Sequence, residues 1–165
     1  MTPWIIYTHS DIESLLEETA SQDIGQIAGY GRRSFTSQVS KCPTIVKYFT
    51  QANFKFEFNL SLTGLVSINT YSSKGGNYNW HRDERFDNVG PHKKLSLIVQ
   101  LTDPAEYEGG NFEFEGDIPN RPDPNLLKPK GTVVVFPSYV KHRAAPVTKG
   151  CRESLAAWVQ GPGFK

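Results

Sequence analysis

The sequence predicts a mainly β protein with flanking helices (α+β), in which two packed sheets form a jelly-roll and N-terminal helices pack on one sheet. From residue 54 onward, apolar and polar residues alternate with period two in short runs that end at Gly, Pro, Asn or Asp. Helical spacing is confined to the residues before this point. The length of 165 residues suits a single core. We therefore expect one domain over residues 1–165, with helical support over about 1–53 and a jelly-roll core over about 54–162.

The N-terminal part begins with a short predicted strand over residues 4–7. A predicted helix over residues 11–18 follows, with a serine at its N-cap and apolar residues at helical spacing. Pro43 can open a second helix over residues 44–51. Residues 21–40, between the two helices, are polar and carry glycines, which predicts a loop.

The predicted strands of the core are short and separated by turn residues. The loop over residues 116–130 has too many prolines for an interior strand, and a functional lid and a surface insertion are both open interpretations. The runs with period two lie at residues 55–60, 64–71, 94–101, 111–115, 132–136 and 152–159.

Composition excludes several classes of protein. Lys and Arg total 18 and Asp and Glu total 17, so no global charge attracts nucleic acid or anionic lipid. No apolar run approaches the roughly 20 residues of a membrane helix, and the N-terminus lacks the pattern of a signal peptide. We therefore expect a cytoplasmic protein without nucleic-acid or membrane partners. Cys42 and Cys151 form no C-x-x-C pair and are expected to be ordinary thiols.

The stretch His81 to Asn88 reads HRDERFDN, which fits two different chemistries. It matches the protein-kinase pattern H-R-D-x-x-x-x-N, and it also contains His-x-Asp. A kinase needs a glycine-rich loop, a strand lysine and a D-F-G triplet, and this chain contains no D-F-G. Gly29 to Ser34 lacks the third glycine, and Lys47 lies in a helical pattern. The kinase interpretation is therefore rejected.

The iron interpretation needs two histidines and one carboxylate on one face of a metal ion. Residues i and i+2 of a strand project to the same side, so His81 and Asp83 can share one ion. His142, which follows the predicted strand at 132–136, is the candidate third ligand. His9 and His92 lie beside a helix start and in a turn, and both are expected at the surface.

A buried cation is predicted on the last strand. Period two places Arg152, Ser154 and Trp158 on one face, and Leu155 and Ala157 on the other. An inward-facing arginine needs an anionic partner. The guanidinium can hold one end of a dicarboxylate bidentately, with the Ser154 hydroxyl as a further donor, whereas a salt bridge to a neighbouring strand is the structural alternative.

Taken in order, these motifs resemble the 2-oxoglutarate- and iron(II)-dependent dioxygenases, and particularly their prolyl 4-hydroxylase-like branch. The resemblance covers about residues 67–162 and implies a double-stranded β-helix, the cupin-like form of the jelly-roll. Besides His-x-Asp, His142 and Arg152-x-Ser154, it rests on Tyr71-Ser-Ser-Lys-Gly-Gly-Asn-Tyr-Asn-Trp, Gly109-Gly-Asn-Phe, Lys130-Gly-Thr-Val-Val-Val-Phe-Pro and Arg143-Ala-Ala-Pro-Val.

The resemblance implies that His81, Asp83 and His142 ligate Fe(II). It also implies that Arg152 pairs with the far carboxylate of the co-substrate 2-oxoglutarate, and that the Tyr71 hydroxyl reaches the same carboxylate. O₂ is the second co-substrate, and ascorbate is a candidate reductant.

The substrate follows less directly from the sequence. Tyr78, Trp80, Arg33 and Trp158 are candidate substrate contacts, and Gly29 to Ser37 resembles the mobile segment that folds over peptide in this branch. The resemblance implies hydroxylation of a C–H bond, foremost in a prolyl residue of a peptide or protein, with succinate and CO₂ as co-products. A free amino acid or another small molecule is the alternative substrate, and a non-catalytic jelly-roll binding module is the alternative of another class.

Two positions depart from the patterns of relatives. Gln100 stands where some relatives carry a tyrosine that also bonds the co-substrate. Trp158 stands where nucleic-acid demethylases of the wider superfamily carry a second arginine, which argues against a nucleobase substrate.

Overall fold

The computed structural model describes residues 2–8, 12–19, 24–29, 32–39, 42–61, 66–84, 86, 90–118 and 120–163. Within residues 24–29 and 32–39 it describes the backbone and, of the side chains, that of Ser34.

The described chain forms two α-helices, two short 3₁₀ helices and eleven strands. The helices are α1 (Ile12–Thr19), α2 (Pro43–Phe56), η1 (Pro104–Glu106) and η2 (Pro124–Leu127). The strands are β1 (Ile5–Tyr7), β2 (Ile24–Gly29), β3 (Arg32–Val39), β4 (Val66–Ser72), β5 (Asn77–His81), β6 (His92–Gln100), β7 (Tyr107–Gly109), β8 (Phe112–Phe114), β9 (Val133–Pro137), β10 (His142–Ala144) and β11 (Val147–Gly161).

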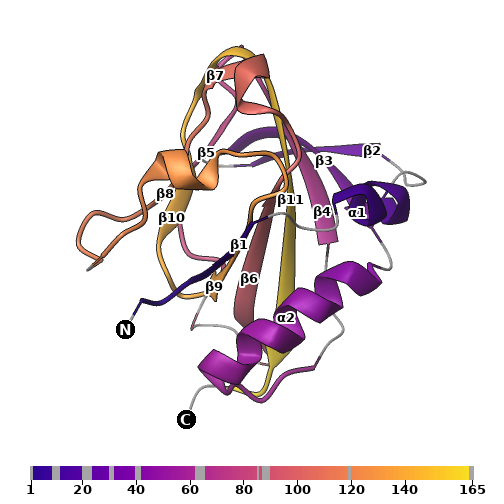
Figure 1. Ribbon diagram of the computed structural model, residues 1–165, viewed down its shortest axis with the longest axis vertical. Helices are drawn as coiled ribbons and strands as arrows, with labels where there is room; N and C mark the ends of the chain where they lie inside the picture. The colour runs from indigo at the N-terminus through magenta and orange to yellow at the C-terminus, as the bar shows by residue number, and fades with distance from the viewer. Residues whose placement is uncertain are drawn as a thin grey trace.

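The strands pair in one continuous path that folds back on itself. Its order is β1-β9-β6-β11-β4-β3-β5-β10-β8, with β2 beside β3 and β7 beside β11. Strand β3 turns the corner, because its first residues pair with β5 and its later residues pair with β4. Helix α2 lies across the part of the sheet that contains β6 and β11, and β8 and β10 lie to one side (Figure 1). The predicted jelly-roll with helices on one sheet is confirmed.

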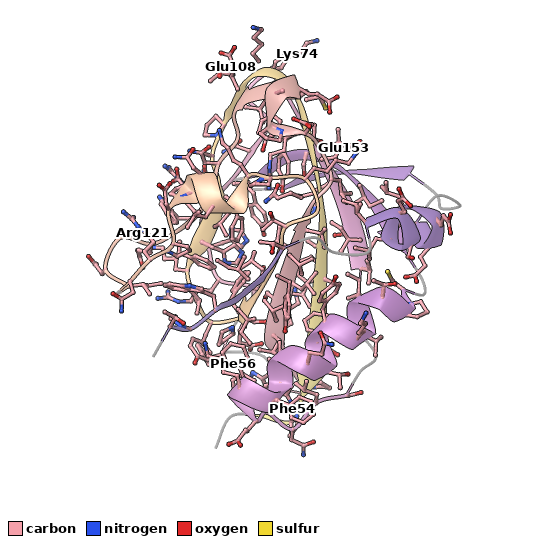
Figure 2. All side chains as sticks on the ribbon, in the orientation of Figure 1. Phe54, Phe56, Lys74, Glu108, Arg121 and Glu153 are labelled. Atoms are coloured by element: carbon pink, nitrogen blue, oxygen red, sulfur yellow. The ribbon has the colours of Figure 1, made fainter. Side chains whose placement is uncertain are left out.

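Two hydrophobic cores lie on opposite faces of the large sheet. The outer core joins the helices to one face, where α2 contributes Phe49 and β11 contributes Leu155. The inner core fills the space between the two parts of the jelly-roll and contains Phe114 and Phe136. Side chains occupy the space between α2 and the sheet, whereas Phe54 at the far end of α2 is 83% exposed (Figure 2). The inner face also carries the polar residues of the pocket described below.

The two helices are linked at their ends by Glu18. Its carboxylate accepts hydrogen bonds from the backbone N–H of Thr44 at 3.2 Å and from the Thr44 hydroxyl at 2.8 Å. Cys42, the N-cap of α2, makes no side-chain cap of its own. A carboxylate at this helix terminus satisfies a free N–H group and interacts favourably with the helix dipole. Glu18 therefore fixes the start of α2 against α1.

The strand predicted at residues 55–60 is wrong. Helix α2 continues to Phe56, and Glu57 ends it in the left-handed conformation with φ of 54°. The Asn53 side chain then exchanges hydrogen bonds with the backbone of Phe58, at 2.8 and 3.0 Å. These bonds hold the chain against the helix end, so its alternating phenylalanines pack on the outer core without forming a strand.

The loop predicted at residues 21–40 is also wrong where the structure describes it. Strands β2 and β3 form an antiparallel hairpin, and β3 continues the sheet beside β4. Strand formation here depends on the neighbouring strand edge, which can override the weak β propensity of a polar stretch with glycines. Residues 30 and 31, between the strands, lie outside the described residues.

None of the helices in the described part of the chain is long and apolar enough to cross a membrane.

Candidate metal centre

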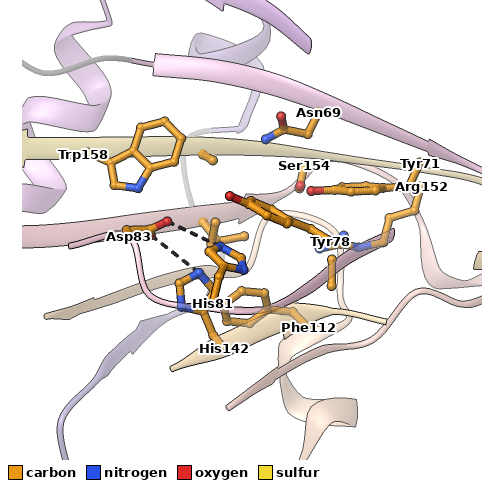
Figure 3. A pocket seen from close by; sticks show the side chains of 13 residues that line it. Asn69, Tyr71, Tyr78, His81, Asp83, Phe112, His142, Arg152, Ser154 and Trp158 are labelled. Carbon is orange, nitrogen blue, oxygen red and sulfur yellow. Dashed lines mark ion pairs between the residues drawn. The ribbon is translucent and has the colours of Figure 1, made fainter. Parts of the chain in front are cut away.

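Three side chains with metal-binding atoms meet at the inner end of two paired strands. His81 ends β5, Asp83 follows it, and His142 begins β10 directly opposite His81 in the strand register. His81 Nε2 lies 3.4 Å from Asp83 Oδ1, and His142 Nε2 lies 3.5 Å from Asp83 Oδ2. One ligand atom from each residue lies within 4.8 Å of the others. Figure 3 shows both imidazoles turned toward the Asp83 carboxylate.

Both histidines are oriented in the same way, each by the backbone carbonyl two residues before it. His81 Nδ1 lies 2.6 Å from the carbonyl oxygen of Asn79, and His142 Nδ1 lies 2.9 Å from that of Val140. A carbonyl oxygen only accepts hydrogen bonds, so each Nδ1 carries the proton and each Nε2 keeps a free lone pair. Histidines that ligate metals use this arrangement to fix the tautomer and the ring orientation.

Asp83 is held by neighbours on other elements. The Ser96 hydroxyl on β6 donates to Asp83 Oδ2 at 2.7 Å and lies 2.8 Å from the Ser138 hydroxyl. The Asp83 backbone N–H donates to the Ser138 carbonyl at 3.0 Å. The carboxylate orientation is therefore set before any ligand arrives.

The surroundings of the site favour an ionised Asp83 carboxylate and a neutral His142 imidazole. Burial raises the pKa of Asp83, but the imidazoles of His142 and His81 and the hydrogen bond from Ser96 outweigh it and lower the pKa below its usual range. Burial lowers the pKa of His142, so its imidazole stays neutral at neutral pH.

The donor set fits a divalent metal with open positions. Bonds of about 2.1 Å at right angles place neighbouring ligand atoms about 3 Å apart, close to the separations of 3.4 and 3.5 Å. Two imidazoles and one carboxylate on one face are the set used by non-haem iron(II) oxygenases. His81, Asp83 and His142 therefore suit iron(II) in both atom type and spacing.

Arg152 lies in the same pocket, away from the metal-binding residues. It is 1% exposed, and its Nε and Nη2 both donate to the amide oxygen of Gln100, at 3.1 and 2.9 Å. The guanidinium carbon lies 5.4 Å from the centre of the Tyr71 ring, and the Tyr107 hydroxyl bonds the guanidinium as well. Among the described residues no carboxylate forms an ion pair with it, so the predicted alternative of a salt bridge to a neighbouring strand is not found there.

One pocket connects the metal-binding residues with Arg152. Figure 3 shows Trp158 near Asp83 at one end and Tyr71 with Arg152 at the other, with Tyr78 between them. Tyr78 stacks on His81 with ring centres 3.6 Å apart. The structure thus brings together every predicted metal and cofactor residue, including Ser154, which also lines the pocket.

The other predicted substrate contacts differ in position. Trp158 lines the pocket, and its indole Nε1 is buried without a hydrogen-bond partner in the described part of the chain. Trp80 is 38% exposed and does not line this pocket, and Arg143 lies over its ring at 4.6 Å. The Arg33 backbone lies opposite Asn77 of β5, and its side chain is outside the described residues.

Several residues that organise the site were missed by sequence reasoning. Ser96 is one of them: it is a polar, inward-facing residue in the apolar part of β6, a usable signal, whereas Gln100 was noted only as a departure from relatives and its bond to Arg152 was not foreseen. The surface position expected for His92 is wrong, because its ring is buried and its Nδ1 lies 2.6 Å from Glu84 Oε1. No local pattern marks that pair. His9 lies outside the described residues.

A jelly-roll that gathers two imidazoles and one carboxylate in a pocket is the arrangement of the non-haem iron oxygenases. Residues 66–160 match the family model described as the 2OG-Fe(II) oxygenase superfamily, and the chain belongs to this superfamily. The resemblance inferred from the sequence is confirmed.

Curated relatives agree with this membership. A PKHD-type hydroxylase of Prochlorococcus marinus is 35% identical over 89 residues, which are 54% of this chain and 38% of the relative. Another, of Parvibaculum lavamentivorans, is 37% identical over 98 residues, covering 56% of this chain and 42% of the relative. The chain thus spans about two fifths of the length of the curated relatives it matches.

Solved structures share the fold over nearly the whole chain. A prolyl-4-hydroxylase of Pseudomonas putida has a TM-score of 0.70 at 17% identity, covering 99% of this chain and 95% of its own. The viral collagen prolyl hydroxylase of Paramecium bursaria Chlorella virus-1, in its 2OG complex, has a TM-score of 0.70 at 19% identity, covering 98% and 97%.

Proposed function

We propose that the chain is an Fe(II)- and 2-oxoglutarate-dependent dioxygenase that hydroxylates a prolyl residue of a peptide or protein. The observation that carries the proposal is the pocket itself. It holds a His-Asp-His donor set in one part and a buried arginine without a described anionic partner in another.

In this proposal His81, Asp83 and His142 hold the metal. Their Nε2 and carboxylate atoms are oriented by the Asn79 and Val140 carbonyls and by Ser96. When bound, Fe(II) supplies the activation of O₂, coupled to the oxidative decarboxylation of 2-oxoglutarate to succinate and CO₂. The residues themselves set the ligand geometry, and the neutral His142 needs no deprotonation before it binds.

Arg152 binds the far carboxylate of 2-oxoglutarate in this proposal. A buried guanidinium with neutral neighbours is costly unless an anion compensates its charge. The two hydrogen bonds to Gln100 use Nε and Nη2, and the guanidinium fork suits a carboxylate. Tyr71 and Ser154 line the same end and carry hydroxyl groups that can donate to the carboxylate.

The remaining walls position the substrate and exclude water. Ile98, Phe112 and Ala156 give the pocket apolar sides. The Tyr78 ring covers one face of the His81 imidazole, and the buried Trp158 N–H has no hydrogen-bond partner among the described residues. We propose both residues as substrate contacts, with Trp158 donating a hydrogen bond.

The names of similar proteins support the choice of substrate. The curated relatives are called PKHD-type hydroxylases, and the similar structures include several prolyl hydroxylases. One is a Trichoplax adhaerens prolyl hydroxylase in complex with a hypoxia inducible factor peptide fragment. A free amino acid as substrate and a non-catalytic binding module are outcomes that the experiments below distinguish. A cytoplasmic location stays a prediction from the sequence.

The first experiment is an anaerobic absorption titration of metal-free protein with iron(II) and then with 2-oxoglutarate. We expect a visible charge-transfer band that requires both additions. His142→Ala should lose the band, and Arg152→Ala should need at least tenfold more 2-oxoglutarate, since a hydrogen-bonded charge is worth about 1.5–3 kcal/mol. Lys74→Met, at an exposed turn, serves as the control. A folded, iron-loaded protein without a band would reject the dioxygenase and favour the binding module.

The second experiment asks what is hydroxylated. Proline-containing peptides and free L-proline are incubated with the iron-loaded protein, 2-oxoglutarate and O₂, and the products are analysed by mass spectrometry. The gain of one oxygen atom on a prolyl residue supports the proposal. Oxidation of free proline alone would replace the peptide substrate with a small molecule.

A further inference from the structure

A second cavity adjoins the metal-binding pocket, and we call it the outer cavity. Its volume is about 320 Å³, enough for an amino-acid side chain, and Tyr78 and Asp83 line both spaces. Its other charged lining residues are Arg82, Glu84 and Lys93. The outer cavity therefore lies next to the metal-binding residues, and its walls carry charged side chains.

The negative charges of the outer cavity are already engaged. The Asp83 carboxylate belongs to the metal-binding set. The buried Glu84 carboxylate lies 2.6 Å from His92 Nδ1, and its charge acts on the buried ammonium of Lys94. Neither carboxylate forms a described ion pair with Arg82 or Lys93.

The positive charges have only neutral contacts in the described part of the chain. Arg82 donates from Nε to the Tyr139 carbonyl at 2.9 Å, which leaves the outer nitrogens of its guanidinium available. Lys93 Nζ lies 4.4 Å from the centre of the Trp158 ring, and Trp158 lines the metal-binding pocket.

We propose that the outer cavity binds a carboxylate of the substrate through Lys93 and Arg82, and thereby places the neighbouring carbon at the metal centre. The proposal rests on the proposed function, because it names a recognition group of that same site. Two cations can share the two oxygens of one carboxylate, and the half-buried position of Lys93 strengthens its contact relative to water. The enzyme then prefers substrates with an acidic group next to the oxidised residue.

Two sources can supply this carboxylate, and matched probe pairs separate them. The first pair is a short peptide with blocked ends in which proline is flanked by glutamates, and the same peptide with glutamines. The second pair is free L-proline and its amide. Binding to protein loaded with manganese(II) and 2-oxoglutarate is measured by anaerobic calorimetry, so that no turnover is required.

We expect the glutamate peptide to bind at least threefold more tightly than the glutamine peptide, a difference typical of partly exposed charge pairs. Lys93→Met and Arg82→Met should each reduce this ratio, and the double variant should abolish it. Lys74→Met, which removes a lysine that projects from the turn between β4 and β5, should leave it unchanged (Figure 2). A preference for free proline over its amide that disappears in the same variants would also support the site, with the free acid as the source.

The proposal is overturned if neither acidic probe is preferred, including by failure to bind, or if the preference survives in the double variant. Failure of the proposed function is recognised separately, because it removes the charge-transfer band that iron(II) and 2-oxoglutarate give without substrate.

Discussion

The amide oxygen of Gln100 accepts hydrogen bonds from both Nε and Nη2 of Arg152, at 3.1 and 2.9 Å. β6 and β11 are paired here, with Gln100 opposite Ser154 in the register. A neutral residue thus orients the buried cation without neutralising it. Gln100, where the resemblance to relatives implies a tyrosine, acts on the arginine instead.

Replacing Gln100 should change affinity for 2-oxoglutarate more than turnover at saturation. Gln100→Leu removes two hydrogen bonds to a charged group, so we expect the KM for 2-oxoglutarate to rise about tenfold. Gln100→Glu should raise it further, because a carboxylate there would compete with the co-substrate for Arg152. The rate of succinate formation without substrate gives both the KM for 2-oxoglutarate and the turnover at saturation. Gln51→Leu, on the exposed side of α2, is the control. An unchanged KM in both variants would remove Gln100 from the site.

Ser96 should control metal affinity through Asp83. Its hydroxyl donates to Asp83 Oδ2 at 2.7 Å, and loss of such an outer contact typically weakens metal binding about 10- to 100-fold. Ser96→Ala should therefore show that loss in a manganese(II) titration followed by electron paramagnetic resonance. Ser73→Ala, at an exposed position, is the matched control. Equal affinities for the two variants would contradict this role.

The metal-free protein should lose stability as pH falls below about 6.5, the ordinary pKa of histidine. Burial lowers the pKa of His142 in the folded state, so the unfolded chain binds this proton more readily and protonation favours unfolding. The lowered pKa of Asp83 adds a further loss of stability as pH falls below about 4. Urea unfolding at a series of pH values measures both effects. His142→Gln should flatten the dependence of stability on pH between about 4 and 6.5. An unchanged slope in this range would show that His142 is not its cause.

Gly110 should be required for the position of Arg152. Its φ is +61°, and a Cβ atom there would lie 2.8 Å from Val147 Cγ2 and 3.2 Å from Arg152 Cδ. Gly110→Ala should cost about 1–3 kcal/mol of unfolding free energy and also raise the KM for 2-oxoglutarate. Gly90→Ala separates strain from contact, because Gly90 has a φ of +123° and its Cβ would meet no described atom within 4 Å. If both variants change KM equally, the contact with Arg152 is not the cause.

The buried Glu84 and His92 pair should contribute to stability next to the metal ligands. His92→Leu leaves the Glu84 carboxylate, whose side chain is 1% exposed, without its partner at 2.6 Å. Breaking a buried pair typically costs about 3–5 kcal/mol. Thermal and urea unfolding measure the loss, and the double variant with Glu84→Gln should recover part of it. A double variant as unstable as the sum of the single variants would show that the two residues act independently.

The strands in which polar and apolar residues alternate clearly could be predicted from the sequence. The sequence also predicted which of their side chains share a face of the sheet. On β11, Leu155 and Ala157 lie in the outer core, whereas Arg152 and Ser154 line the pocket, as period two predicts. The metal-binding set was predicted for the same reason, because His-x-Asp has a fixed spacing. Its third member, His142, was a candidate because it follows the predicted strand at 132–136, and the resemblance to a family supported that choice.

The parts that could not be predicted depend on partners distant in sequence. Strand β10 has only three residues, and it is a strand because β5 and β8 lie on either side of it. The hairpin of β2 and β3 likewise depends on the edges of β4 and β5. Glu84 and His92 carry no local signal for their contact. In each case the cause is a tertiary contact that overrides local propensity.

Strand β11 is the last strand along the sequence. In the sheet it lies between β4 and β6 and pairs with both along most of their length. During synthesis, β4 and β6 leave the ribosome with facing edges that no earlier strand fills. Long-range pairing of this kind slows folding and leaves strand edges open to association with other chains. Because Arg152 belongs to β11, the nascent chain also acquires this proposed anchor for the co-substrate only when the sheet closes. Until that moment the pocket lacks one of its walls, and the open edges of β4 and β6 can pair with other chains.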